Sequence, residues 1–109
     1  MSTSRLDPFR DYVFDQLAGL EHFAHRAMFG GYGLYFDGKM FGVIAGKLYF
    51  KTDEESRPAY LAAGMIAWDQ SKSYYEVPPA VLAQPEALAL WARRAATVQP
   101  AKSRKPKRG

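Results

Sequence analysis

Apolar side chains recur at helical spacing near the start of the chain. Asp7 followed by Pro8 is a typical helix start, with a side chain that can cap the first turn and a proline where no N–H is needed. The apolar residues that follow fall at intervals that place them on one helix face: Phe9, Tyr12, Val13, Leu17 and Leu20. We therefore expect an amphipathic helix that ends near Gly19 and packs this face against a core.

Aromatic and β-branched residues separated by short turns dominate the chain after this helix. Asp37-Gly38 is typical of a two-residue hairpin turn, because both of its positions need a positive φ. The pattern predicts an antiparallel meander of three strands, at residues 32–36, 39–45 and 47–52. Residues 23–28 are a candidate for a further strand in front of the meander.

A second helix is expected to open at Thr52, because Thr52 and Glu55 have the spacing of a capping box. Pro58 lies inside this helical pattern, where a proline loses a hydrogen bond and crowds the preceding turn. The helix therefore either restarts near Arg57 or kinks, and Gly64 marks its end.

Two short strands and a last helix complete the pattern. The strands are expected at residues 65–69 and 73–77, and Pro78-Pro79 breaks the second of them. Pro85 opens the helix, whose buried stripe is expected to hold Leu88, Trp91, Ala92 and Ala95. The predicted order is α-β-β-β-α-β-β-α, an α+β fold with helices packed against an antiparallel sheet.

Positive charge is concentrated at the end of the chain. The net charge is +4, and segment 101–109 holds five cations and no acid: Lys102, Arg104, Lys105, Lys107 and Arg108. Subtracting five from +4 leaves −1 for residues 1–100. We expect one domain at residues 1–98 and a disordered basic tail at 99–109, because the tail has almost nothing to bury. The tail predicts weak, sequence-independent binding of nucleic acid.

The composition excludes several classes of site. The chain has no cysteine, which rules out disulfides, thiolate metal ligands and cysteine nucleophiles. No apolar run approaches the roughly 18 residues of a membrane-spanning helix, and the first residues lack the pattern of a signal peptide. These features lead us to expect a cytoplasmic protein without a membrane partner.

Three glycines lie close together in segment 26–35, at Gly30, Gly31 and Gly33. A phosphate-binding loop needs a strand before such glycines and a helix after them, whereas a hairpin is expected here. A tight turn with a close backbone approach is therefore favoured. The candidate interaction surface consists of Arg26, Phe29, Gly30, Gly31, Tyr32 and Gly33. Met28, Leu34 and Phe36 are expected to point into the core, and Arg26 and Tyr32 to reach the surface.

The polar residues do not form a recognisable catalytic or metal site. His22 and His25 lie three apart, but no third ligand is near them in the sequence. The acidic residues at 53–55 suit the start of a helix, where they interact favourably with its dipole. We therefore expect no enzyme activity, no cofactor and no metal.

Many aromatic residues fall in the expected strands: Tyr32, Tyr35, Phe36, Tyr49, Phe50, Trp68, Tyr74 and Tyr75. Beside Lys47 and Lys51 they could form a platform on which the bases of a single-stranded nucleic acid stack. Packing in a half-buried sheet is the favoured interpretation, because no basic stripe alternates with them in the sequence.

Two segments resemble the N-terminal domain of the TfoX/Sxy competence regulators. They are RAMFGGYGLYFDGKMFGVIAGKLYFK at 26–51 and SYYEVPPAVLAQPEALALWARRA at 73–95, and the resemblance spans nearly all of residues 7–96. It implies an α+β fold with an antiparallel sheet and supplies no catalytic residues. Regulators of this family typically carry a C-terminal domain that resembles helix-hairpin-helix DNA-binding modules. This sequence ends at Gly109 without one, so we expect a stand-alone N-terminal domain.

The leading functional hypothesis is a non-enzymatic interaction domain that serves as an accessory transcription or competence regulator through protein contacts. The alternative is a small-molecule-binding domain with its ligand near the glycine segment.

Overall fold

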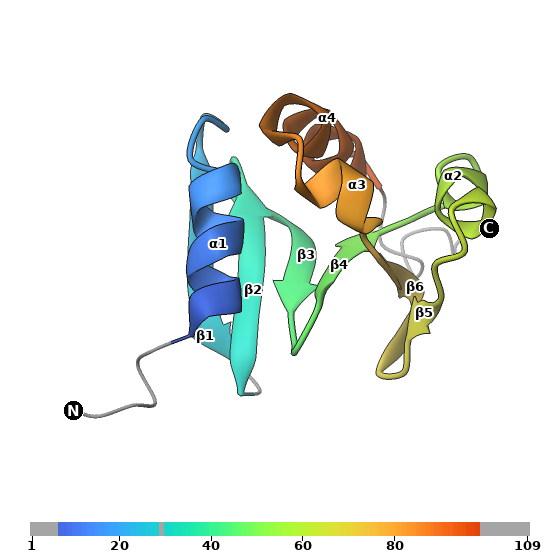
Figure 1. Ribbon diagram of the computed structural model, residues 1–109, viewed down its shortest axis with the longest axis horizontal. Coiled ribbons are helices and arrows are strands. Elements are labelled where there is room, and N and C mark those ends of the chain that lie inside the picture. The colour runs from blue at the N-terminus through green and yellow to red at the C-terminus, as the bar shows by residue number, and fades with distance from the viewer. Residues whose placement is uncertain (1–6, 29, 99–109) are drawn as a thin grey trace, which may run out of the picture.

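Six strands and four helices make up the part of the chain that the computed structural model describes, residues 7–28 and 30–98 (Figure 1). The strands are β1 (Phe23–Met28), β2 (Gly31–Phe36), β3 (Lys39–Ile44), β4 (Leu48–Lys51), β5 (Ala67–Trp68) and β6 (Ser71–Glu76). The helices are α1 (Pro8–Gln16), α2 (Arg57–Ala62), α3 (Pro79–Leu82) and α4 (Pro85–Ala96). The strands form one antiparallel sheet in the order β1-β2-β3-β4-β6-β5, which confirms the α+β class.

One hydrophobic core joins the helices to a single face of the sheet. The sheet contributes buried side chains that the register places on that face: Leu34, Phe41, Ile44, Leu48 and Phe50. Each helix adds residues to the same core, such as Val13 from α1, Tyr60 from α2, Leu82 from α3 and Leu88 from α4.

The opposite side of the sheet is a separate layer, which we call the open face. The register places on it Met28, Gly33, Tyr35, Met40, Val43, Tyr49, Lys51, Trp68 and Tyr74. These residues do not belong to the cluster that the described helices build with the sheet. The aromatic residues of the strands therefore divide between the two faces, so packing in the core accounts for only part of them.

Helix α1 begins as predicted. The Asp7 carboxylate accepts a hydrogen bond from the Arg10 N–H at 3.0 Å, and Pro8 occupies the first turn. The helix ends at Gln16, earlier than expected, and a turn carries Leu17 and Leu20 into the core. Tyr12 lies on the outer side of the helix and is 43% exposed, so the expectation that it packs in the core is wrong.

Helix α2 begins at Arg57, as the restart hypothesis predicted, but the capping box does not form. The Thr52 hydroxyl instead donates to the Ser73 carbonyl at 2.9 Å, because Thr52 still lies alongside the β6 segment. Asp53 instead closes the turn that leads into the helix, and its Oδ1 accepts the N–H groups of Glu55 and Ser56 at 3.1 and 2.9 Å.

Two elements extend the predicted order. The candidate segment 23–28 is the strand β1, and the short helix α3 follows Pro78, which was expected only to break a strand.

The predicted Asp37-Gly38 turn is confirmed, with φ values of 53° and 81°. The strands near 65–69 and 73–77 are shifted to Ala67–Trp68 and Ser71–Glu76, because the chain turns at Asp69-Gln70.

Candidate functional site

The glycine segment forms the hairpin between β1 and β2. Gly30 turns the chain in the left-handed region, with φ of 76°. Gly31 is required for a different reason, because a Cβ there would overlap the Ile44 carbonyl oxygen. At Gly33 a Cβ would lie 2.8 Å from the terminal methyl of Met28. The segment therefore serves the fold through one turn and two close approaches.

Met28 does not point into the core as expected. It pairs with Gly31, and its side chain reaches along the open face to cover Gly33. Leu34 is fully buried and Phe36 packs against the core, so those two predictions are confirmed. The absence of a side chain at Gly33 leaves the space that Met28 fills.

Tyr32 is tied to helix α1 and does not form a free surface. Its hydroxyl accepts a hydrogen bond from Arg10 Nη1 at 2.7 Å, and the guanidinium lies 5.4 Å from the centre of its ring. The hydrogen bonds to Tyr32 and Asp11 raise the pKa of Arg10. A shallow hollow of about 410 Å³ lies here, lined by Asp7, Arg10, Ala27, Met28, Gly30, Gly31 and Tyr32. Arg10 already has partners in it, which weakens the case for a ligand near the glycines.

The other members of the candidate surface lie in different environments. Arg26 and Gly30 are exposed, Gly31 is half-buried and Gly33 is buried. Phe29 and the five tail cations at 102–108 lie outside the described residues. The exposed described members of the predicted surface are therefore Arg26, on the strand β1 at one end of the sheet, and Gly30, in the turn that follows β1.

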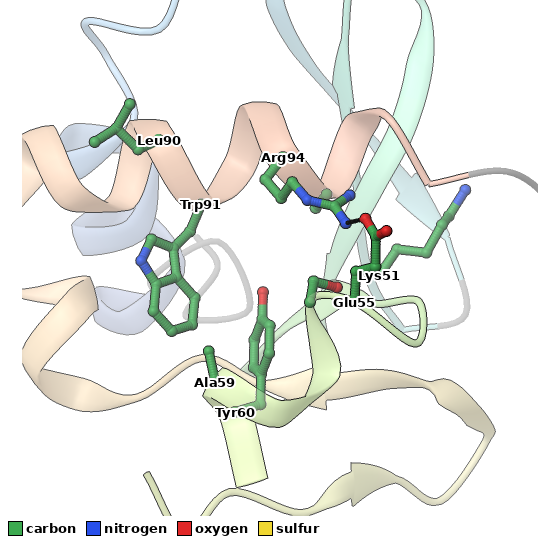
Figure 2. A pocket seen from close by; sticks show the side chains of 9 residues that line it. Lys51, Glu55, Ala59, Tyr60, Leu90, Trp91 and Arg94 are labelled. Atoms are coloured by element: carbon green, nitrogen blue, oxygen red, sulfur yellow. Dashed lines mark hydrogen bonds and ion pairs between the residues drawn. The ribbon is translucent and has the colours of Figure 1, made fainter. Parts of the chain in front are cut away.

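A second site, which the sequence did not predict, is a cleft of about 300 Å³ between α2 and α4. Its walls are mainly apolar, and it is lined by Lys51, Glu55, Ser56, Ala59, Tyr60, Leu90, Trp91, Arg94 and Ala95. Figure 2 shows the hydroxyl of Tyr60 directed toward α4, between Trp91 and Arg94. The rings of Tyr60 and Trp91 meet edge to face, with centroids 4.8 Å apart.

Charged groups border this cleft. Arg94 Nη2 lies 3.0 Å from Asp53 Oδ1 and 3.4 Å from Glu55 Oε1. Burial alone would raise the pKa of Asp53, but hydrogen bonds from Ser56 and Arg94 outweigh it and lower that pKa. Burial lowers the pKa of Lys51 and raises that of Tyr60. The cleft therefore combines an apolar interior and one buried phenol with charged groups of both signs, of which Arg94 is paired with Asp53 and Glu55.

Sequence reasoning missed the cleft because its residues come from three separate elements. Trp91 was expected on the buried stripe of the last helix, and this was the available signal. The sequence around Tyr60 did not indicate the cleft, because the contact of Tyr60 with Trp91 depends on how α2 packs on α4.

The histidines do not come together with other potential metal ligands. His25 stacks on Phe14 with centroids 4.1 Å apart, and His22 lies 4.0 Å from a Glu21 oxygen. Within residues 7–28 and 30–98, no three His, Cys, Asp or Glu side chains form a group that could hold a metal ion. In the same part of the chain, no helix has the length and apolar character to span a membrane.

The architecture agrees with a comparison against known families. The model of the TfoX N-terminal domain matches residues 15–99, which include all six strands and helices α2 to α4. A search of curated proteins found no match. The family match covers most of the chain and includes both the β1–β2 hairpin and the α2–α4 cleft, so the chain belongs to the TfoX N-terminal domain family.

Proposed function

We propose that this chain is a non-catalytic regulatory domain, linked to competence, that acts by binding a partner protein along the edge of its sheet. The family match supports a competence-related regulatory role. The observation that carries the mode of action is the position of β1 at the end of the sheet. The contact surface is the outward edge of β1, residues 24–27.

Strand β1 has the features of an edge that accepts another strand. Among the described strands it pairs with β2 alone, and its four central residues are all exposed. The outward N–H and C=O groups of such an edge can bind an extended segment of a partner by adding a strand to the sheet. Arg26 is exposed on this strand, and arginine is a frequent anchor of protein interfaces.

Site-specific crosslinking tests this proposal. A photoreactive residue replaces Arg26 on β1, and in a matched control it replaces Arg93, which is exposed on α4. We expect a discrete crosslinked partner from host cells at position 26 and none at position 93. Arg26→Ala should weaken recovery of the same partner and leave the melting temperature nearly unchanged. Equal crosslinking at both positions would contradict the edge proposal.

The α2–α4 cleft favours a second candidate function, the binding of a small amphipathic molecule. Tyr60 is 3% exposed, and its hydroxyl has no hydrogen-bond partner among the described residues. Such a phenol can donate to a polar ligand atom, while Trp91 and Ala59 contact apolar parts. This moves the proposed ligand site away from the glycine segment.

Aromatic carboxylates and the matching uncharged aromatic amides are suitable probes for the cleft, because its interior is apolar and its border holds Lys51 and the ion pair of Arg94 with Glu55. We expect a bound probe to raise the melting temperature of the wild-type chain and to raise that of Tyr60→Phe less. If the panel stabilises both proteins equally, Tyr60 does not contact a ligand.

A further inference from the structure

The open face carries a cluster of aromatic side chains that lies apart from the core. Tyr49 and Trp68 are stacked with centroids 5.6 Å apart, and the Tyr74 ring meets Trp68 edge to face at 5.9 Å. Burial raises the pKa of Tyr74, and interaction with Tyr35 contributes to this shift. All four side chains are partly exposed; Tyr49, Trp68 and Tyr74 form one cluster across β4, β5 and β6, and Tyr35 lies on the same face on β2.

The charges of the described residues are divided between the two sides of the sheet. The strands and the turns between them hold five cations and three acids, a balance of +2: Arg26, Lys39, Lys47, Lys51, Lys72, Asp37, Asp69 and Glu76. One of the acids is paired, since Glu76 Oε1 lies 3.7 Å from Lys47 Nζ. The helices and their flanking turns instead hold eight acids and four cations. A basic, aromatic surface thus exists on a domain with almost no net charge.

We propose that the open face binds single-stranded nucleic acid, with bases stacked on Trp68 and its neighbouring tyrosines and phosphates held by the surrounding lysines. Stacking of bases on aromatic side chains and attraction of the backbone by cations are the two general features of such surfaces. The role goes beyond the protein contact proposed for β1.

The charges favour this occupant over two others. A second copy of the chain would bring its own positive open face against this one, and like charges would repel. The tail is also cationic, so it would not be attracted to this surface. A polyanion complements the positive charge of the open face. The exposed rings favour a single strand over a duplex, because the bases of a single strand are free to stack on them.

The test uses the full chain with its five tail cations replaced by glutamine, which removes the tail as a source of phosphate contacts. The probe is a fluorescein-labelled oligo(dT) of about twelve nucleotides, within the range of known single-strand sites. Anisotropy gives the affinity, and stacking on Trp68 is reported by the part of the tryptophan quenching that Trp68→Ala abolishes, because Trp91 also emits. Inorganic polyphosphate is the control polyanion without bases.

We expect the oligonucleotide to quench tryptophan emission and polyphosphate to leave it unchanged. Trp68→Ala should weaken binding by about tenfold or more, whereas Tyr12→Ala, an exposed tyrosine on α1, should not. Lys72→Glu, a change at an exposed residue, should weaken binding and make the salt dependence less steep.

The proposal is overturned if Trp68→Ala, folded as judged by its melting curve, binds like the parent chain. It is also overturned if duplex DNA binds equally well without quenching, or if Lys72→Glu binds like the parent. Sedimentation as a dimer that Trp68→Ala dissociates, without oligonucleotide binding, would assign the open face to a second copy instead. Failure to find a crosslinked partner at position 26 would not change the measured binding of the oligonucleotide. The proposal for the edge of β1 and the proposal for the open face can therefore fail independently.

Discussion

At the scale of single residues, Gly31 and Gly33 illustrate two different reasons for a glycine on the same strand face. A side chain at Gly31 meets the backbone of β3, which cannot move without breaking the sheet. A side chain at Gly33 meets the flexible ends of Met28 and Met40, which can turn aside. The glycine motif in the sequence indicated a close approach, but not which glycine required it.

The substitution Gly31→Ala is therefore expected to lower the free energy of unfolding by about 1–3 kcal/mol, a typical cost of overpacking. Gly33→Ala should cost less, because methionine side chains absorb the added methyl. Urea denaturation of both variants gives the comparison. A larger loss for Gly33→Ala than for Gly31→Ala would contradict this assignment.

Asp53 links the start of α2 to the end of α4. Its carboxylate accepts two backbone N–H groups and pairs with Arg94. Asp53→Asn should lower the free energy of unfolding by about 1 kcal/mol at neutral pH, in the range of a lost cap or partly exposed ion pair. The neighbouring exposed Glu54→Gln is the control.

The loss of unfolding free energy in Asp53→Asn should depend on pH, because the contacts of Asp53 lower the pKa of its carboxyl. A carboxylate with a lowered folded-state pKa stabilises the protein above its unfolded-state pKa, near 3.9, and stops doing so as the pH falls through its folded-state pKa. The difference between wild type and Asp53→Asn should therefore shrink below about pH 4. A difference that grows on acidification would show that Asp53 is not held ionised by these contacts.

At the scale of elements, local signals predicted the starts of helices and the tight hairpin well. Asp7-Pro8 starts a helix because the Asp7 side chain caps the first turn. Asp37-Gly38 forms a tight turn because both residues adopt a positive φ. The capping box at Thr52 failed because the hydroxyl has a competing acceptor, the Ser73 carbonyl, which is distant in the sequence. Register, bulges and helix contacts decide such cases, and none of them is local.

The packing of α2 on α4 gives a prediction at this scale. Because the Tyr60 hydroxyl has no partner among the described residues, Tyr60→Phe removes a buried polar group without breaking a hydrogen bond that the structure shows. Its stability should match or exceed that of wild type. Thermal and urea unfolding measure this, and a loss of more than about 1 kcal/mol would mean that the hydroxyl is hydrogen-bonded in the folded protein.

At the scale of the whole molecule, the arrangement of charge could not be read from the sequence. The basic residues of the open face and its border come from strands and turns that are far apart in the sequence, and only the register brings them together beside the aromatic rings. The favoured interpretation of the sequence instead placed nucleic-acid binding in the tail, at residues 102–108, which lie outside the described residues, and left a platform of strand aromatics beside Lys47 and Lys51 as the weaker alternative. The contribution of the tail to nucleic-acid binding is therefore separate from the one proposed for the open face.

Duplex DNA separates the contribution of the tail. With its five cations engaged, the salt dependence of binding should have a slope near −4 to −5 at most, on the order of −0.9 for each phosphate contact. Replacing the tail cations with glutamine should nearly abolish duplex binding, because the remaining chain has a net charge near zero. Duplex binding that survives the replacement would place the contact on the folded domain.

If the domain works by binding a partner along β1, amide hydrogen exchange in this strand should change when the partner binds. In the free chain the outward amides of residues 24–27 should exchange quickly, because no described strand pairs with β1 on the side away from β2. In the complex with the partner identified by crosslinking, we predict slower exchange at these residues and little change in α4. Unchanged exchange in β1, with protection concentrated at the α2–α4 cleft, would contradict the account.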